Sequence, residues 1–124
     1  MQKNGLDALI EQEKNARDLG FEWPDVQMIL DQAISEVEEV RQAIEEGSQS
    51  HIQEEIGDLL HTAISLCIFV GFNTEETLDK ASKKFAIRME ALKTIAAERG
   101  FTSLKNQPPE FLMGLWREAK IRTK

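Results

Sequence analysis

Two pairs of acidic residues have a spacing that could support chemistry. Glu36 and Glu39 are three residues apart, as are Glu55 and Asp58. Residues three apart on a helix are surface neighbours, so each pair would present two carboxylates side by side. Carboxylates that face one another repel, and a hard divalent cation such as Mg²⁺ or Mn²⁺ removes that repulsion. The spacing therefore indicates a metal site, and the alternative is an acidic surface exposed to solvent.

The helices that must position these pairs are visible in the apolar pattern. Apolar residues recur every three or four positions over residues 26–44 and again over 52–68, which predicts two amphipathic helices. Only a short turn, residues 47–50, separates them, so they should fold back antiparallel. Counted from this turn, the two acidic pairs differ by about two residues, or about 3 Å along the helix axes. The four carboxylates are therefore expected to lie level, at the edge of the buried faces.

The rest of the chain has the same helical character, with only three prolines and seven glycines among 124 residues. A first helix is expected over residues 6–19, a fourth helix with a buried face over 78–96, and a short last helix around 111–116. The residues expected to begin or end helices are Gly20, Asp25, Gly47, Ser50 (in a capping box), Gly71, Asn73 and Gly100. The predicted fold is a single all-α domain over residues 1–124, a helical bundle.

The two central helices carry more apolar surface than the chain itself can cover. The stripes over residues 26–44 and 52–68 extend around nearly half of each helix. A chain of 14.1 kDa with a single layer of helices would leave part of both exposed. Association with a second copy would complete a four-helix core. A homodimer or a dimer of dimers is therefore expected.

Composition excludes several classes of protein. Hydrophobic residues make up 41% and charged residues 30%, as in globular chains, and no apolar run reaches the ~20 residues of a membrane span. The formal net charge of −7 argues against a nucleic-acid polymer as partner. The first residues lack the layout of a signal peptide, and the single Cys67 excludes an internal disulfide. A cytoplasmic protein with Cys67 in its core is expected.

Charge is unevenly distributed along the chain. Residues 1–60 contain 15 acidic and 4 basic residues, whereas residues 61–124 contain 7 acidic and 11 basic residues. Within the basic half, Lys84 and Arg88 are one helical turn apart and could hold one polyanion together. This distribution suits a site that holds cations with one half and phosphates with the other. Two solvated surfaces of opposite charge are the alternative.

Six short blocks of the sequence occur in an order typical of one known family. They are residues 20–24 (GFEWP), 35–40 (SEVEEV), 54–60 (EEIGDLL), 84–88 (KFAIR), 96–100 (AAERG) and 115–117 (LWR). Together they resemble the MazG-like nucleoside triphosphate pyrophosphohydrolases, in which an EExxE helix and an ExxD helix hold Mg²⁺. The similarity is to the C-terminal catalytic domain of two-domain MazG proteins, and it covers about residues 20–120.

The resemblance implies a bundle of the all-α NTP pyrophosphatase type. It also implies Mg²⁺-dependent hydrolysis of a nucleoside triphosphate to the monophosphate and pyrophosphate, with Mn²⁺ able to replace Mg²⁺. The residues implied as catalytic metal ligands are Glu36, Glu39, Glu55 and Asp58. The residues assigned to substrate binding are Gln32, Ser35, Glu54, Lys84, Arg88 and Trp116. Ser35 stands in place of the first glutamate of EExxE, which puts the substrate preference and the number of metal ions in doubt.

Alternatives remain at three points. The rival function is a non-catalytic helical interaction protein that has lost turnover, for which Ser35 is the motive. Asp58 and His61 form a DxxH pair faintly similar to the ExxH motifs of di-iron bundles, although those sites use one such motif on each of two helices. Of the two tryptophans, Trp23 is expected to be structural and Trp116 to lie near the nucleotide.

Overall fold

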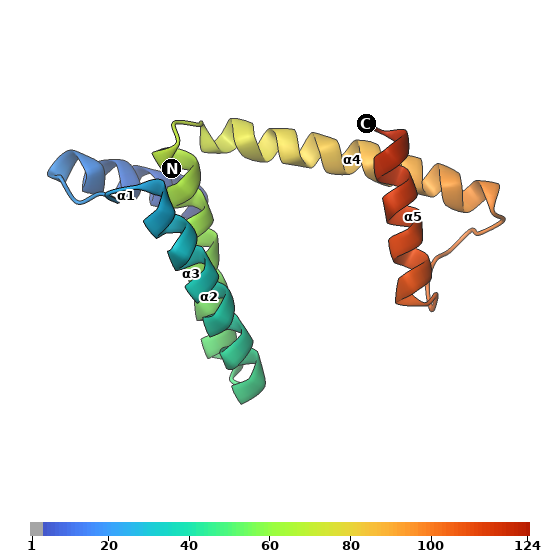
Figure 1. The fold of residues 1–124 in the computed structure, drawn as a ribbon, viewed down its shortest axis with the longest axis horizontal. Coiled ribbons are helices and arrows are strands. Elements are labelled where there is room, and N and C mark those ends of the chain that lie inside the picture. The colour runs from blue at the N-terminus through green and yellow to red at the C-terminus, as the bar shows by residue number, and fades with distance from the viewer. Residues whose placement is uncertain (1–3) are drawn as a thin grey trace. The chain divides into compact units, whose positions relative to one another are not determined.

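The computed structural model describes residues 4–124, which form helices and no strand (Figure 1). The helices are α1 (Gly5–Leu19), α2 (Val26–Glu46), α3 (Gln49–Phe69), α4 (Thr74–Glu98) and α5 (Pro109–Arg122). The all-α prediction is confirmed. The described residues divide into two compact units at the boundary between Thr77 and Leu78, in the first turn of α4, and each unit is described by itself below. The assignment of residues 1–124 to one domain stays a prediction.

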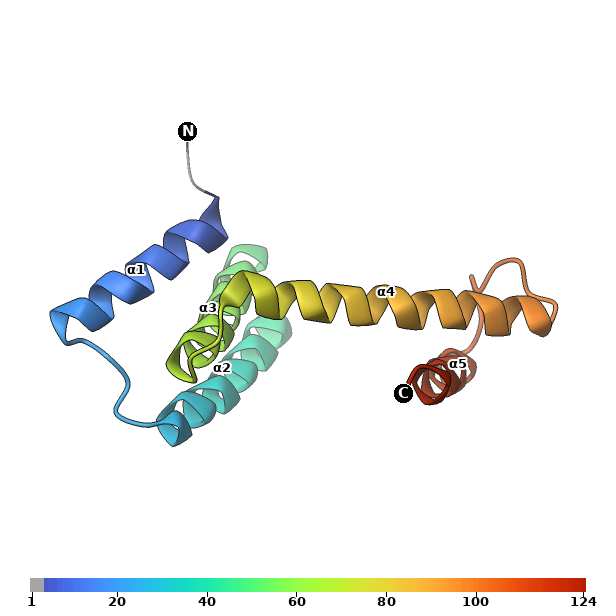
Figure 2. The same cartoon turned by 90° about the horizontal axis from the view of Figure 1, so that it is seen from above.

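The first unit is built on an antiparallel hairpin of α2 and α3, which lie side by side in both views (Figures 1 and 2). Asp25 caps α2 as predicted, because its Oδ1 accepts a hydrogen bond of 2.9 Å from the Met28 N–H. Gly47 ends α2 at φ 81°, a left-handed conformation that glycine adopts without steric cost. The turn of the hairpin is therefore set by these local signals.

The capping box predicted at Ser50 is wrong. Helix α3 begins at Gln49, so Ser50 lies inside its first turn and Ser48 is the N-cap residue. The Ser48 side chain makes no capping hydrogen bond within the described residues; its Oγ lies 3.5 Å from Ser50 Oγ. The chain enters α3 almost directly after Gly47, which makes the turn even shorter than expected.

The predicted apolar faces of α2 and α3 are only partly covered. Ile29 and Ala43 of α2 are fully buried. Other members of the same stripes are exposed, with 67% of Ile34 and 61% of Leu60 accessible to solvent. Helix α1 packs on α3 and covers one side of the hairpin, so the rest of its apolar surface stays open.

The second unit pairs α4 with α5. Ile95, Leu115 and Ala119 form its fully buried centre, with Leu92 and Phe111 packed around them. The prediction that the fourth helix is buried along its whole apolar face is wrong. Leu78 and Phe85 are more than half exposed, whereas Ile95 and Ala96 are buried. The reason is length, since α5 has 14 residues against 25 in α4.

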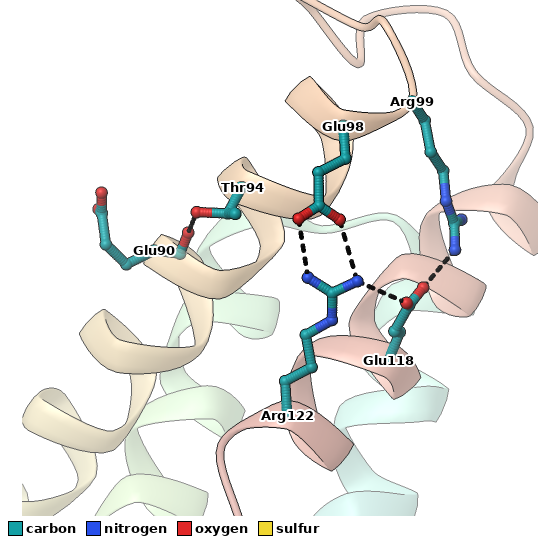
Figure 3. Close-up of polar contacts among 6 residues, drawn as sticks. All are labelled: Glu90, Thr94, Glu98, Arg99, Glu118 and Arg122. Atoms are coloured by element: carbon teal, nitrogen blue, oxygen red, sulfur yellow. Dashed lines mark hydrogen bonds and ion pairs between the residues drawn. The ribbon is translucent and has the colours of Figure 1, made fainter.

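A network of ion pairs joins α5 to the end of α4 (Figure 3). The Arg122 guanidinium donates to both carboxylate oxygens of Glu98, at 3.3 and 3.0 Å, and to Glu118 at 3.0 Å. Arg99 donates to the other oxygen of Glu118. The hydrogen bonds from Arg122 hold the pKa of Glu98 below its usual value. These contacts fix the register of the two helices.

No single helix within residues 4–124 has the length and hydropathy of a membrane span; α3 and α4 meet those criteria only when counted together across the break between them.

The left-handed turn at Gly47 gives a test of the hairpin. Gly47→Ala should lower the free energy of unfolding by about 1–2 kcal/mol, because a Cβ is disfavoured at positive φ. Gly57→Ala is the matched control on α3, where an added Cβ meets no atom within 4 Å in the described chain beyond its neighbours and the backbone of its own helix. It should raise the free energy of unfolding by about 0.5–1 kcal/mol, since alanine is the better helix former. Urea denaturation measures both, and equal effects of the two substitutions would contradict the assigned turn.

Candidate functional site

Three of the four predicted ligands gather where α2 faces α3. Glu36 and Glu39 of α2 and Glu55 of α3 each place one carboxylate oxygen within 4.8 Å of the other two. The antiparallel hairpin and its short turn bring the two helices into this register. A single ion could therefore contact all three side chains.

The burial of these carboxylates makes the cluster costly without a cation. Glu36 is only 6% exposed, and the Glu55 side chain is 13% exposed. Among residues 4–124, neither Glu36 Oε2 nor Glu55 Oε2 has a hydrogen-bond partner, although both atoms are buried. A buried oxygen without a partner loses its hydration, and three adjacent carboxylates also repel one another. A hard cation with oxygen ligands would relieve both effects, so the donor set fits Mg²⁺ or Mn²⁺.

Asp58 lies outside this group of three. Its side chain is exposed and lines a cavity of about 440 Å³ that also borders Glu36. The aspartate side chain is one methylene shorter than glutamate, which limits its reach from the α3 backbone. Its role as a fourth ligand stays a prediction.

The cavity beside Glu36 and Asp58 is formed by α1, the segment that follows it, and the hairpin. The residues that line it include three aromatic side chains, those of Phe21, Trp23 and Phe69. Trp23 is half-buried there, and its structural role stays a prediction.

Glu13 of α1 is a polar residue of this cavity that the sequence reasoning missed. Its Oε1 accepts a hydrogen bond from Ser65 Oγ and lies next to His61 Nε2, both at 2.6 Å. His61 is thus directed to Glu13, and it does not belong to the carboxylate group of Glu36. Nothing in the sequence spacing pairs residues 48 and 52 positions apart.

His51 is a second neighbour of the site that was missed. Its Nδ1 lies 3.2 Å from Glu46 Oε2, and its Nε2 lies 3.2 Å from Glu55 Oε1. Partial loss of hydration disfavours the charged ring, but the hydrogen bonds to Glu46 and Glu55 outweigh it and raise the pKa of His51 above 6.5. The four-residue spacing between His51 and Glu55 was a readable signal.

The predicted substrate residues are divided between the two units. Gln32, Ser35 and Glu54 lie on the hairpin; Gln32 also lines the large cavity, and Ser35 and Glu54 are exposed. Lys84 and Arg88 lie on α4 and line a shallow hollow of about 300 Å³ in the second unit.

Arg88 and Trp116 are brought together in the second unit. The Arg88 guanidinium carbon lies 5.9 Å from the centre of the Trp116 ring, and the same ring lies 5.9 Å from Phe85. An arginine over an aromatic face is held by the ring quadrupole. This contact orients Arg88 on α4.

Cys67 is less buried than expected. It is half-buried, and its Sγ lies 3.4 Å from Thr77 Oγ1 and 3.7 Å from the Phe72 carbonyl oxygen. The thiol thus contacts polar atoms of the turn after α3 and of the start of α4, where the sequence predicted an apolar core.

Comparison with known proteins gives a family match. The profile described as the MazG nucleotide pyrophosphohydrolase domain matches residues 25–92, more than half of the chain. The chain is 30% identical over 112 residues to the nucleoside triphosphate pyrophosphohydrolase of Escherichia coli (strain K12). It is also 30% identical over 108 residues to the nucleoside triphosphate pyrophosphohydrolase/pyrophosphatase MazG of Thermotoga maritima. Each match covers 87% of this chain and 41% of the relative, so the chain spans about two fifths of the length of these relatives.

If Glu36, Glu39 and Glu55 bind a divalent cation, that cation should stabilise the folded protein. Addition of Mg²⁺ or Mn²⁺ to metal-free protein should raise its Tm, because a ligand that binds only the folded state stabilises by about 2.7 kcal/mol at a hundred times its Kd. Glu55→Gln should remove most of this response and leave the fold intact, since it lowers the repulsion in the metal-free cluster.

Glu45→Gln, an exposed position on the same helix as Glu36, is the control and should respond to Mg²⁺ as the wild type does. Thermal denaturation with EDTA and with each cation gives the comparison. Equal cation responses in the Glu55 variant and the wild type would contradict a metal site at this cluster.

Proposed function

Because the chain belongs to the MazG nucleotide pyrophosphohydrolase domain family, we propose that it hydrolyses a nucleoside triphosphate to the monophosphate and pyrophosphate. The observation that carries this proposal is the group of Glu36, Glu39 and Glu55, which lies inside the matched segment 25–92. The names of the two relatives state the same activity, and those proteins are more than twice as long as this chain.

The carboxylates of the hairpin would hold the cation. Glu36, Glu39 and Glu55 supply the clustered oxygens, and Asp58 is proposed as a fourth ligand from the neighbouring cavity wall. A bound Mg²⁺, or Mn²⁺ in its place, would neutralise charge on the phosphate oxygens and lower the pKa of a water molecule.

Glu39 is the proposed general base. Glu36 is buried, and its Oε1 already accepts a hydrogen bond from Gln32, whereas Glu39 is exposed to solvent. As the water oxygen bonds to the α-phosphorus, one of its protons passes to Glu39. The bond from the α-phosphorus to the oxygen that bridges to the β-phosphate breaks at the same time. Pyrophosphate then leaves as the second product.

The second unit would bind the phosphates. Lys84 and Arg88 project from α4 one turn apart, and Arg88 is oriented by the Trp116 ring. Arginine offers a planar fork to phosphate oxygens, and lysine offers a point charge. We assign Trp116 to the vicinity of the nucleotide and Gln32, Ser35 and Glu54 to substrate contacts on the hairpin.

The exposed apolar surface of the hairpin supports the proposal that the chain acts as a homodimer or a dimer of dimers. Ile34, Ile44 and Leu60 are each more than half exposed, although the periodicity places them on the apolar faces of α2 and α3. A second copy would bury these side chains and complete a four-helix core.

Turnover is the direct test of the proposed activity. With Mg²⁺, a panel of nucleoside and deoxynucleoside triphosphates should yield monophosphate and pyrophosphate, which a coupled pyrophosphatase converts to measurable phosphate. EDTA should abolish the reaction, and Mg²⁺ or Mn²⁺ should restore it. Full turnover in chelator would exclude the proposed chemistry, and no turnover with any member of the panel would favour the non-catalytic interaction protein.

Loss of either basic side chain should weaken substrate binding. Lys84→Ala and Arg88→Ala each remove a charge-assisted hydrogen bond of about 1.5–3 kcal/mol, or about ten- to hundredfold in kcat/KM. Arg88→Lys should be nearly as damaging, because it loses the planar fork. Lys93 lies on the same helix beside Glu90, at 3.9 Å, and Lys93→Ala is the control. If kcat/KM changed by less than about twofold in all four variants, the assignment of Lys84 and Arg88 to phosphate binding would be contradicted.

The dimer proposal predicts a mass above 14.1 kDa in solution. Burial of each exposed Ile or Leu contributes roughly 1.5–3 kcal/mol, enough in sum to hold two copies together at micromolar concentration. Light scattering measures this mass directly. Ile34→Glu should shift it toward the monomer, whereas a monomeric wild type would contradict the proposal.

A further inference from the structure

Two hydrogen bonds at the carboxylate cluster follow the same pattern. Gln32 Nε2 donates to Glu36 Oε1 at 2.6 Å, and His51 Nε2 lies 3.2 Å from Glu55 Oε1. Each partner stands four residues before its glutamate on the same helix, so the two side chains lie one turn apart on one face. Both glutamates are therefore held at Oε1 from the preceding turn.

The opposite oxygen of each glutamate is left for another partner. Glu36 Oε2 and Glu55 Oε2 are buried, and neither finds a hydrogen-bond partner in the described part of the chain, residues 4–124. Both glutamates belong to the group whose oxygens lie within 4.8 Å of one another. One oxygen of each carboxylate is thus engaged by the protein, and the other is buried without a hydrogen-bond partner within residues 4–124.

We propose that Gln32 and His51 are positioning residues of the metal centre, which fix the carboxylate planes of Glu36 and Glu55 and leave Oε2 of each as the ligand atom. The inference rests on the proposed metal-dependent function. A glutamate has three rotatable side-chain bonds, and a hydrogen bond to one oxygen removes the alternative orientations before the cation arrives. Partners of this kind orient ligands and raise metal affinity.

His51 is itself held in place by a residue of α2. Its other ring nitrogen lies 3.2 Å from Glu46 Oε2, in the last turn of α2. The ring therefore bridges the end of α2 and the ligand on α3. The orientation of Glu55 therefore depends on the packing of α3 against the end of α2.

Helix α2, which carries Gln32, also provides a matched control. Gln27 Nε2 donates to Asp31 Oδ1 at 3.0 Å, again with a four-residue spacing, but this pair is exposed and lies outside the carboxylate group. Loss of the Gln27 amide removes the same kind of hydrogen bond from α2 and leaves the metal centre untouched.

The test is Mn²⁺ binding to the full chain in the absence of nucleotide, measured by calorimetry below the Tm of every variant. Gln32→Leu and His51→Leu should each raise the Kd for Mn²⁺ by about 10–100-fold, and Gln27→Leu should change it by less than about twofold. His51→Gln should restore binding to within about threefold of the wild type, because a glutamine at this spacing reaches a glutamate oxygen, as Gln32 does.

A second readout separates positioning from a purely structural role. The Mg²⁺ concentration for half-maximal turnover should rise in the Gln32→Leu and His51→Leu variants by the same factor as the Kd. In the His51→Leu variant, kcat at saturating Mg²⁺ should stay within about threefold of the wild type. Variants that bind Mn²⁺ as the wild type does would overturn the positioning roles alone. A wild-type chain that binds no Mn²⁺ would overturn the proposed function together with this inference.

Discussion

The cost of burying carboxylates against one another is the constraint on which this structure depends. Two helices bring Glu36 and Glu55 together with their Oε2 atoms out of water and without partners within residues 4–124. Each such atom loses its hydration, and the charges repel across the helix interface. A hairpin built only for stability would place apolar side chains here. The sequence instead places three glutamates at this position, where a bound cation would offset the cost.

The local features of the fold were predictable because each depends on a few neighbouring residues. The end of α2 at Gly47 and its beginning at Asp25 follow from one left-handed glycine and one capping carboxylate. The approach of Glu36 to Glu55 follows from helical periodicity and a short turn. The prediction of an N-cap at Ser50 was wrong because two serines near the turn can each cap α3. The choice between Ser48 and Ser50 depends on how α2 and α3 pack together.

Contacts between distant segments could not be predicted in the same way. Glu13 meets His61 and Ser65 only because α1 folds back over α3, and no spacing rule links positions so far apart. The burial of α4 shows the same limit, since its periodicity is uniform while α5 covers only the part around Ile95. Asp58 follows Glu55 by three residues on α3, but it lies outside the group around Glu36.

The short connection between α2 and α3 also bears on how the chain folds. Glu36 and Glu55 are joined by a hairpin whose turn contains only Gly47 and Ser48 outside the helices. The entropy lost on closing a loop grows with its length, so these ligands meet at a small entropic cost. Contacts local in sequence also form quickly. The carboxylate group that would hold the cation is therefore encoded by one contiguous segment of the chain, and its assembly depends on contacts that are local in sequence.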